Sequence, residues 1–209
     1  DAVGVEGATL ISHDEDRVEF DRTTSKDAGW YRVNAPSLEQ TFVQVEGEGL
    51  VPTGASGLPG GNPRLRVPNG TFVAVSEAAL AELRVKWAGC PGVDDDGAVL
   101  GRVELAEFEQ TTGERIILQT AELTLQIDGG ARRAACYLGA DGTYDPDVEV
   151  TGPSGEFLIT SVPGGLHQLD LIWVPVGGTE DTQTYSTWVP EGGLAPRFPL
   201  LVESPIEAL

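Results

Sequence analysis

The sequence contains no methionine and only two histidines, and both shortages restrict what the protein does. Because a translation start is missing, we expect that a signal peptide has been removed ahead of Asp1. A serine or cysteine hydrolase needs a base within hydrogen-bond reach of its nucleophile. His13 and His167 fall in different halves of the chain, and no Gly-x-Ser-x-Gly motif occurs. The sequence therefore predicts a protein without enzymatic activity.

Long apolar runs are missing as well. A helix that crosses a bilayer needs about 20 consecutive, mostly apolar residues. The longest candidates here are short runs such as 169–174, which Asp170 interrupts. We expect no transmembrane segment.

Basic residues are scarce: 13 lysines and arginines stand against 33 aspartates and glutamates, for a formal net charge of −20. Nucleic acid and anionic membrane surfaces repel such a chain, so neither is an expected partner. Only two of the basic residues are lysines, a bias typical of GC-rich bacterial genomes. With the expected signal peptide, this predicts an exported bacterial protein in the periplasm, at the cell surface or outside the cell.

The two cysteines, Cys90 and Cys136, are too few for a disulfide scaffold and lack the Cys-x-x-Cys spacing of zinc and redox sites. In an exported protein they either pair with each other or remain two separate buried thiols. The sequence leaves both interpretations open.

Glycine and proline, by contrast, are abundant, with 27 and 14 residues. They separate short stretches rich in β-branched and aromatic residues at intervals of roughly 8 to 12 residues, which is typical of an all-β sandwich. Only 76–83 carries a helix signal, because Ser76 is a favourable N-cap and good helix formers follow it. We predict one short helix there, at one end of a first domain.

The expected strands form two series, separated by the breaker-rich residues 89–97. The first series is 7–11, 17–21, 30–33, 41–45, 64–67 and 71–75, the last two joined by an Asn69-Gly70 hairpin turn. The second series is 98–105, 116–127, 156–160, 169–174, 185–189 and 198–202. Residues 54–63 are expected to form a long loop. We therefore predict a first domain at 1–91, a linker at 92–97 and a second domain at 98–209.

The two halves repeat a local pattern of turn glycine, aromatic-bearing strand and terminating proline, in 27–36 and again in 153–163. The second half adds Gly101-Arg102-Val103, Ala121-Glu122-Leu123-Thr124-Leu125 and Val162-Pro163-Gly164-Gly165-Leu166-His167-Gln168-Leu169. These motifs resemble the carboxypeptidase regulatory-like, or transthyretin-like, domain of exported bacterial proteins. The resemblance implies two tandem transthyretin-like or Ig-like β-sandwiches, with the short helix in the first. It also implies a role as a spacer, a pilin or adhesin module, or a binding appendage.

The first half departs from this family pattern, because the strand represented by 101–105 in the second half has no counterpart there. The departure predicts an unpaired sheet edge at Gly7, Ala8, Thr9, Leu10 and Ile11. An open edge is a site for strand addition by another chain, a second copy of this protein included. Alternatively, the missing strand comes from 202–209 of the same chain or from residues ahead of Asp1.

Acidic clusters offer oxygen ligands for a hard cation such as calcium. The candidate metal ligands are Asp94, Asp95 and Asp96, with further acidic turns at 13–16 and 141–147. None of these has the alternating Asp-x-Asp-x-Asp-Gly spacing that points successive carboxylates at one ion. Solvated turns are the favoured interpretation, and calcium is the one cofactor that the sequence leaves open.

Aromatic residues bear on the choice of partner. A sugar-stacking platform would form if several of them lay on one exposed face, and otherwise they belong to the core. The candidates are Trp30, Trp87, Trp173 and Trp188, together with Tyr31, Tyr137, Tyr144 and Tyr185. The sequence predicts a non-catalytic structural or interaction module of the cell envelope or extracellular space, including a self-assembling, strand-exchanging subunit. The alternative is a surface lipoprotein or adhesin that binds glycan or protein.

Overall fold

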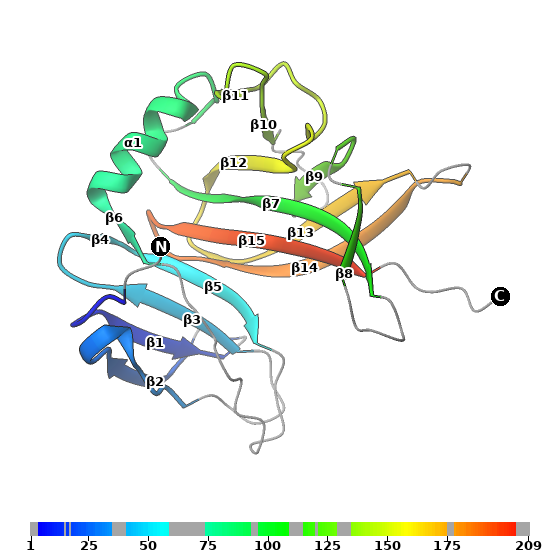
Figure 1. Cartoon of the computed structure of the whole chain (residues 1–209). Coiled ribbons are helices and arrows are strands. Elements are labelled where there is room, and N and C mark those ends of the chain that lie inside the picture. The colour runs from blue at the N-terminus through cyan, green and yellow to red at the C-terminus, as the bar shows by residue number, and fades with distance from the viewer. Residues whose placement is uncertain are drawn as a thin grey trace.

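The structure is a computed structural model that describes residues 4–14, 16, 18–34, 41–58, 74–92, 96–108, 115–119, 121–128, 135–174 and 178–203 (Figure 1). Strands dominate these residues and one α-helix accompanies them, which confirms the all-β class predicted from the sequence. None of the helices in the described ranges has the length and hydropathy of a membrane span.

The N-terminal half contributes short strands, a 3₁₀ helix (η1) and the α-helix. Its elements are β1 (Thr9–His13), β2 (Glu19–Thr24), η1 (Asp27–Gly29), β3 (Thr41–Glu46), β4 (Leu50–Val51), β5 (Thr53–Leu58), β6 (Val75–Ser76) and α1 (Glu77–Trp87). The C-terminal half contributes longer strands. They are β7 (Gly97–Phe108), β8 (Arg115–Gln119), β9 (Thr124–Ile127), β10 (Cys136–Leu138), β11 (Tyr144–Asp145), β12 (Glu156–Val162), β13 (Gly165–Trp173), β14 (Asp181–Val189) and β15 (Leu194–Glu203).

One ten-stranded sheet runs through both halves of the chain. Its strand order is β11-β10-β12-β7-β15-β5-β3-β1-β2, and β8 pairs with β7 outside this row. Strand β15 runs parallel to β7, and its Leu194 also pairs with Thr53 of β5. Figure 1 shows β15, in red, among strands of both halves. The predicted linker at 92–97 therefore does not separate two sheets.

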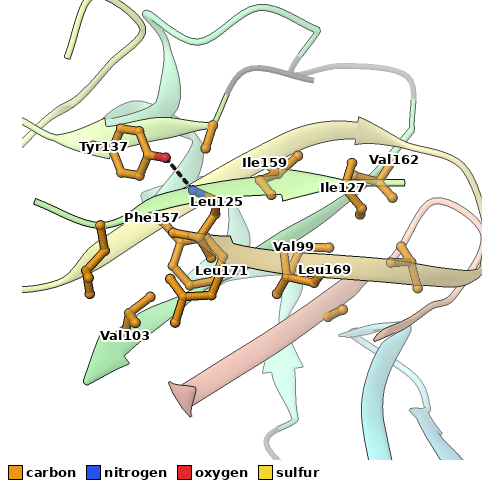
Figure 2. Close-up of a cluster of buried hydrophobic side chains, with 14 of the residues drawn as sticks. Val99, Val103, Leu125, Ile127, Tyr137, Phe157, Ile159, Val162, Leu169 and Leu171 are labelled. Atoms are coloured by element: carbon orange, nitrogen blue, oxygen red, sulfur yellow. Dashed lines mark hydrogen bonds between the residues drawn. The ribbon is translucent and has the colours of Figure 1, made fainter. Parts of the chain in front are cut away.

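The C-terminal part of this sheet packs on a second, three-stranded sheet of order β14-β13-β9. Phe157 and Ile159 of β12 and Val99 of β7 meet Leu169 and Leu171 of β13 in a fully buried core (Figure 2). Side chains of a strand alternate between its two faces, so the neighbours of these residues point the other way. The C-terminal half is thus a layered β-structure, with the core between its two sheets.

The helix α1 begins where the sequence predicts and extends further. The hydroxyl of Ser76 accepts a hydrogen bond from the N–H of Ala79 (3.1 Å), which confirms Ser76 as the N-cap. The predicted helix stopped at Leu83, whereas α1 continues to Trp87 and brings this side chain into the protein interior.

A second core lies beneath α1, on the opposite face of the C-terminal strands. Trp87 and Cys90, from the end of the helix, pack with Leu100, Leu158 and Leu194 from β7, β12 and β15. The helix therefore covers a sheet of the C-terminal half and not only an end of the N-terminal one. This core crosses the predicted boundary between residues 91 and 98.

The N-terminal strands contact β14 through Trp188. Its indole stacks on the imidazole of His13, with ring centroids 5.0 Å apart, and on Phe42 at 5.9 Å. Gly54 of β5 permits this approach, because a Cβ at that position would collide with the backbone oxygen of Trp188. The loop predicted at 54–63 is therefore wrong over 54–58, since the glycine there serves close packing within a strand.

Two other local expectations have different outcomes. Residues 30–33, predicted as a strand, are not assigned to a strand in the described structure, and two of them pack on a hydrophobic cluster. In that cluster, Tyr31 and Val33 pack on Leu10 and Val43. The expected hairpin at Asn69-Gly70 lies outside the described residues.

Candidate interaction surface

The open edge of the N-terminal sheet is β2 and not the segment predicted from the sequence. That prediction named Gly7, Ala8, Thr9, Leu10 and Ile11. Strand β1 pairs antiparallel with β2 on one side and with β3 on the other, and Gly7 and Ala8 are hydrogen-bonded to the backbone of Ser25. The prediction is wrong, because the β1–β2 hairpin itself supplies the missing neighbour. Among the described strands, β2 pairs with β1 alone.

Exposed large hydrophobic side chains are most frequent in the N-terminal residues, in and around β2 along the chain. Seven are exposed in the described part of the chain, and four of these lie within the N-terminal residues: Val5, Val18, Phe20 and Trp30. Trp30 is 76% exposed and Phe20 is 53% exposed, although aromatic side chains are usually buried for most of their area. Grouped exposure of this kind marks interaction sites. We call β2 together with these four side chains the β2 surface.

A defined turn holds Trp30 in place. Ala28 and Gly29 of η1 both adopt left-handed backbone angles, with φ of 58° and 76°. The N–H of Lys26 donates to the carbonyl oxygen of Trp30 (2.7 Å), and Gly4 passes so close that a Cβ on it would collide with the Ala28 carbonyl. A non-glycine residue in this region costs on the order of 1 kcal/mol and clusters at functional sites. The indole is therefore exposed from a well-fixed position.

Asp21 organises the middle of β2. Its Oδ2 accepts hydrogen bonds from the backbone N–H and the side-chain amide of Asn34 (2.6 and 2.7 Å), and its Oδ1 accepts from the N–H of Arg22 (2.9 Å). These hydrogen bonds, that of the Asn34 backbone foremost, lower the pKa of Asp21. The charged carboxylate connects Asn34 to β2 and occupies one backbone donor of this strand, the N–H of Arg22.

Charged side chains connect β2 to β3 across β1. The guanidinium of Arg22 binds Glu19 through Nε and Nη2 (3.0 and 2.8 Å) and Glu46 through Nη1 (3.2 Å). The hydrogen bond from Arg22 lowers the pKa of Glu19, and the same contact raises the pKa of Arg22. These pairs are solvated and stabilise the fold little. The exposed aromatic residues remain the feature of this edge that needs a function.

The structure joins Cys90 and Cys136 in a disulfide, with Cα atoms 6.2 Å apart. The sequence left open whether the two cysteines are bonded or remain separate thiols, and in the structure they are bonded. The bond connects the end of α1 to β10, and both cysteines are buried. Disulfides persist in oxidising compartments.

The predicted calcium ligands are not assembled in the described residues. Asp94 and Asp95 lie outside them, and Asp96 is exposed. In the turn at 141–147, Oδ1 of Asp141 accepts a hydrogen bond from the N–H of Thr143 (2.9 Å), which lowers the pKa of Asp141. Across the described ranges, no three histidine, cysteine, aspartate or glutamate side chains are placed to hold a metal ion.

The condition for a sugar-stacking platform is not met. Trp87, Trp173 and Trp188 are buried, and Trp30 alone is exposed. The histidines are also apart: the ring of His13 stacks on Trp188, whereas His167 is bound to Asp128 and to the Pro163 carbonyl. The β2 surface is the strongest candidate functional site in the described part of the chain.

Comparison of the chain with protein-family models, with curated proteins and with solved structures gives no match. The resemblance to the carboxypeptidase regulatory-like domain therefore rests on the sequence motifs alone. Function has to be argued from the physical features of the β2 surface.

Proposed function

We propose that this protein is a non-catalytic interaction module of the bacterial cell envelope or extracellular space, which binds another protein chain through the β2 surface. The observation that carries the proposal is the exposure of Phe20 on the last strand of the sheet and of Trp30 directly after η1. Edge strands accept a further strand through their free backbone groups, and neighbouring side chains select the partner. The Cys90–Cys136 disulfide supports an exported location.

Three of the other described sheet edges are short, bound or covered, whereas β8, which pairs with β7 alone, is a second open edge beside β2. At the opposite end of the large sheet, β11 has only two residues. On the edge strand β9, the N–H of Leu125 is bound by the hydroxyl of Tyr137. Strand β14 is covered by β5, where Gly54 lies against Trp188. Short, bound or covered edges resist strand addition, whereas six-residue β2 is only partly protected by Asp21.

The proposal retains the family resemblance as its structural basis. In this proposal, two transthyretin-like units serve as a spacer, pilin or adhesin module. A self-assembling subunit is one form of this function, in which the bound chain is a second copy of the protein.

Site-specific photo-cross-linking tests the proposal. A photoreactive phenylalanine analogue replaces Phe20 or Trp30 in the full chain, in cells that make the protein naturally. We expect discrete cross-linked adducts with a protein, because strand addition places the partner within reach of both side chains. The matched control is Val85 on α1, which is also 76% exposed.

The adducts would identify the partner, and an adduct of twice the chain mass would identify a second copy. An absence of adducts at both positions, or equal labelling at Val85, contradicts the proposal. Glycan-array binding that is lost on Trp30→Ala, without any protein adduct, would support the adhesin alternative instead.

A further inference from the structure

His167 is held between two oxygen atoms at one end of the C-terminal sandwich. Its Nδ1 lies 2.7 Å from Oδ2 of Asp128, and its Nε2 lies 2.8 Å from the carbonyl oxygen of Pro163. The side chain is only 10% exposed. One ring thus bridges the end of β9 to the turn between β12 and β13.

Both partner atoms accept hydrogen bonds. The Pro163 carbonyl has no proton to donate, and the other oxygen of Asp128 accepts a hydrogen bond from the N–H of Gln168 (3.0 Å). A neutral imidazole has one N–H donor and one acceptor nitrogen, whereas the protonated ring has two donors. Only the protonated ring makes both contacts, because a neutral one points a lone pair at an oxygen.

We infer that His167 is a proton-dependent clamp: its doubly protonated ring ties the end of β9 to the β12–β13 turn, and the loss of one proton releases the turn. Asp128 keeps its position either way. Its own N–H donates to the Gln168 carbonyl (2.8 Å), and its backbone holds a left-handed φ of 54°. The contact with Pro163 is therefore the one that fails.

The surroundings of the ring are compatible with a positive charge. On β9 the facing group is the Asp128 carboxylate, and on β14 the residue paired with His167 is the uncharged Thr187. The β12–β13 turn supplies Pro163 and Gly164, and Gly164 packs on the backbone of Glu191, an acidic residue of the next turn. No cation of the described residues contacts the ring. The order of this turn therefore depends on whether the ring of His167 carries one proton or two.

Nuclear magnetic resonance of the ¹⁵N-labelled full chain tests the clamp. In mildly acidic solution we expect two slowly exchanging ring N–H protons on His167, coupled across hydrogen bonds to Asp128 and Pro163. On raising the pH, the Nε2 proton disappears and the Gly164 and Gly165 amide signals shift, while the Gln168 amide keeps its slow exchange. A single ring N–H under all conditions, or turn amides that do not respond, overturns the inference.

Two variants and an internal control make the readout specific. Asp128→Asn keeps an oxygen acceptor but removes the negative charge that the doubly protonated ring contacts, so the response of the Gly164 and Gly165 amides changes; an unaltered response contradicts the clamp. His167→Gln abolishes the pH response of these amides, and its persistence is equally contradictory. His13, whose ring nitrogens have no hydrogen-bond partner, is the control, because His13→Gln leaves the turn response unchanged.

Discussion

At the scale of single residues, side chains form hydrogen bonds with backbone N–H and C=O groups that have no partner in a neighbouring strand. The hydroxyl of Ser25 accepts from the N–H of Ala8 (2.9 Å) and donates to the carbonyl of Val5 (2.7 Å), which anchors the start of β1. The hydroxyl of Tyr137 accepts from the N–H of Leu125 (2.8 Å), as Figure 2 shows. Burial raises the pKa of Tyr137 to about 12. A buried N–H left without its acceptor costs more than the hydrogen bond contributes.

Tyr137→Phe tests this bond. The substitution keeps the ring in the core but leaves the Leu125 N–H unpaired, which lowers the free energy of unfolding by about 1 to 3 kcal/mol. Urea denaturation of the variant and the wild type measures the loss. Tyr144→Phe is the matched control, because Tyr144 is buried on the same sheet while its hydroxyl makes no hydrogen bond in the described structure. Equal losses in the two variants would contradict this account.

At the scale of elements, the sequence predicts whether a segment is a helix or a strand better than it predicts where that element lies in the fold. Ser76 and the residues after it predict α1 because capping is local. The face that α1 covers depends on β7, β12 and β15, all distant in sequence. In the same way, Val18 and Phe20 alternate with acids and resemble a half-buried strand. Both are exposed because the face of the sheet onto which they project is left uncovered there, and no local pattern records which face a distant segment covers.

The disulfide at the end of α1 gives a prediction at this scale. Replacing Cys90 and Cys136 together by serine removes the cross-link between α1 and β10, which closes a loop with a sequence separation of 46. The chain-entropy relation gives a loss of about 4 kcal/mol for such a loop. Urea denaturation measures the total, and hydrogen exchange should show that α1 loses protection before β12 does. An unchanged urea midpoint would contradict the expected loss of stability. Equal loss of hydrogen-exchange protection in α1 and β12 would contradict the idea that the disulfide mainly stabilises the attachment of α1.

At the scale of the whole molecule, the structure differs most from the sequence-based expectation. The sequence predicts a boundary at 92–97 because residues that break regular structure gather there. The structure contains most of the strands that were predicted on either side of this boundary. Yet β15 pairs with β7 and reaches β5, and a hydrophobic core joins Trp87 to Leu194 across that boundary. Such contacts link residues about 100 positions apart or more, which neither periodicity nor turn chemistry encodes. The open edge at β2 was not predicted from the sequence, because strand order also depends on contacts between distant residues.

The contact of Trp188 with His13 and Phe42 decides whether the two halves unfold together. Trp188→Ala removes a buried indole from between β14 and the N-terminal strands, which costs about 3 to 5 kcal/mol. Because the large sheet runs through both halves, we expect a single transition, displaced as a whole, both in calorimetry and in the hydrogen exchange of β3 and β13. The exposed Trp30 is the control, since Trp30→Ala should change stability by less than about 0.5 kcal/mol. Two transitions in the wild type, of which Trp188→Ala shifts only one, would mean that the halves are independent domains and that the β15 bridge does not couple them.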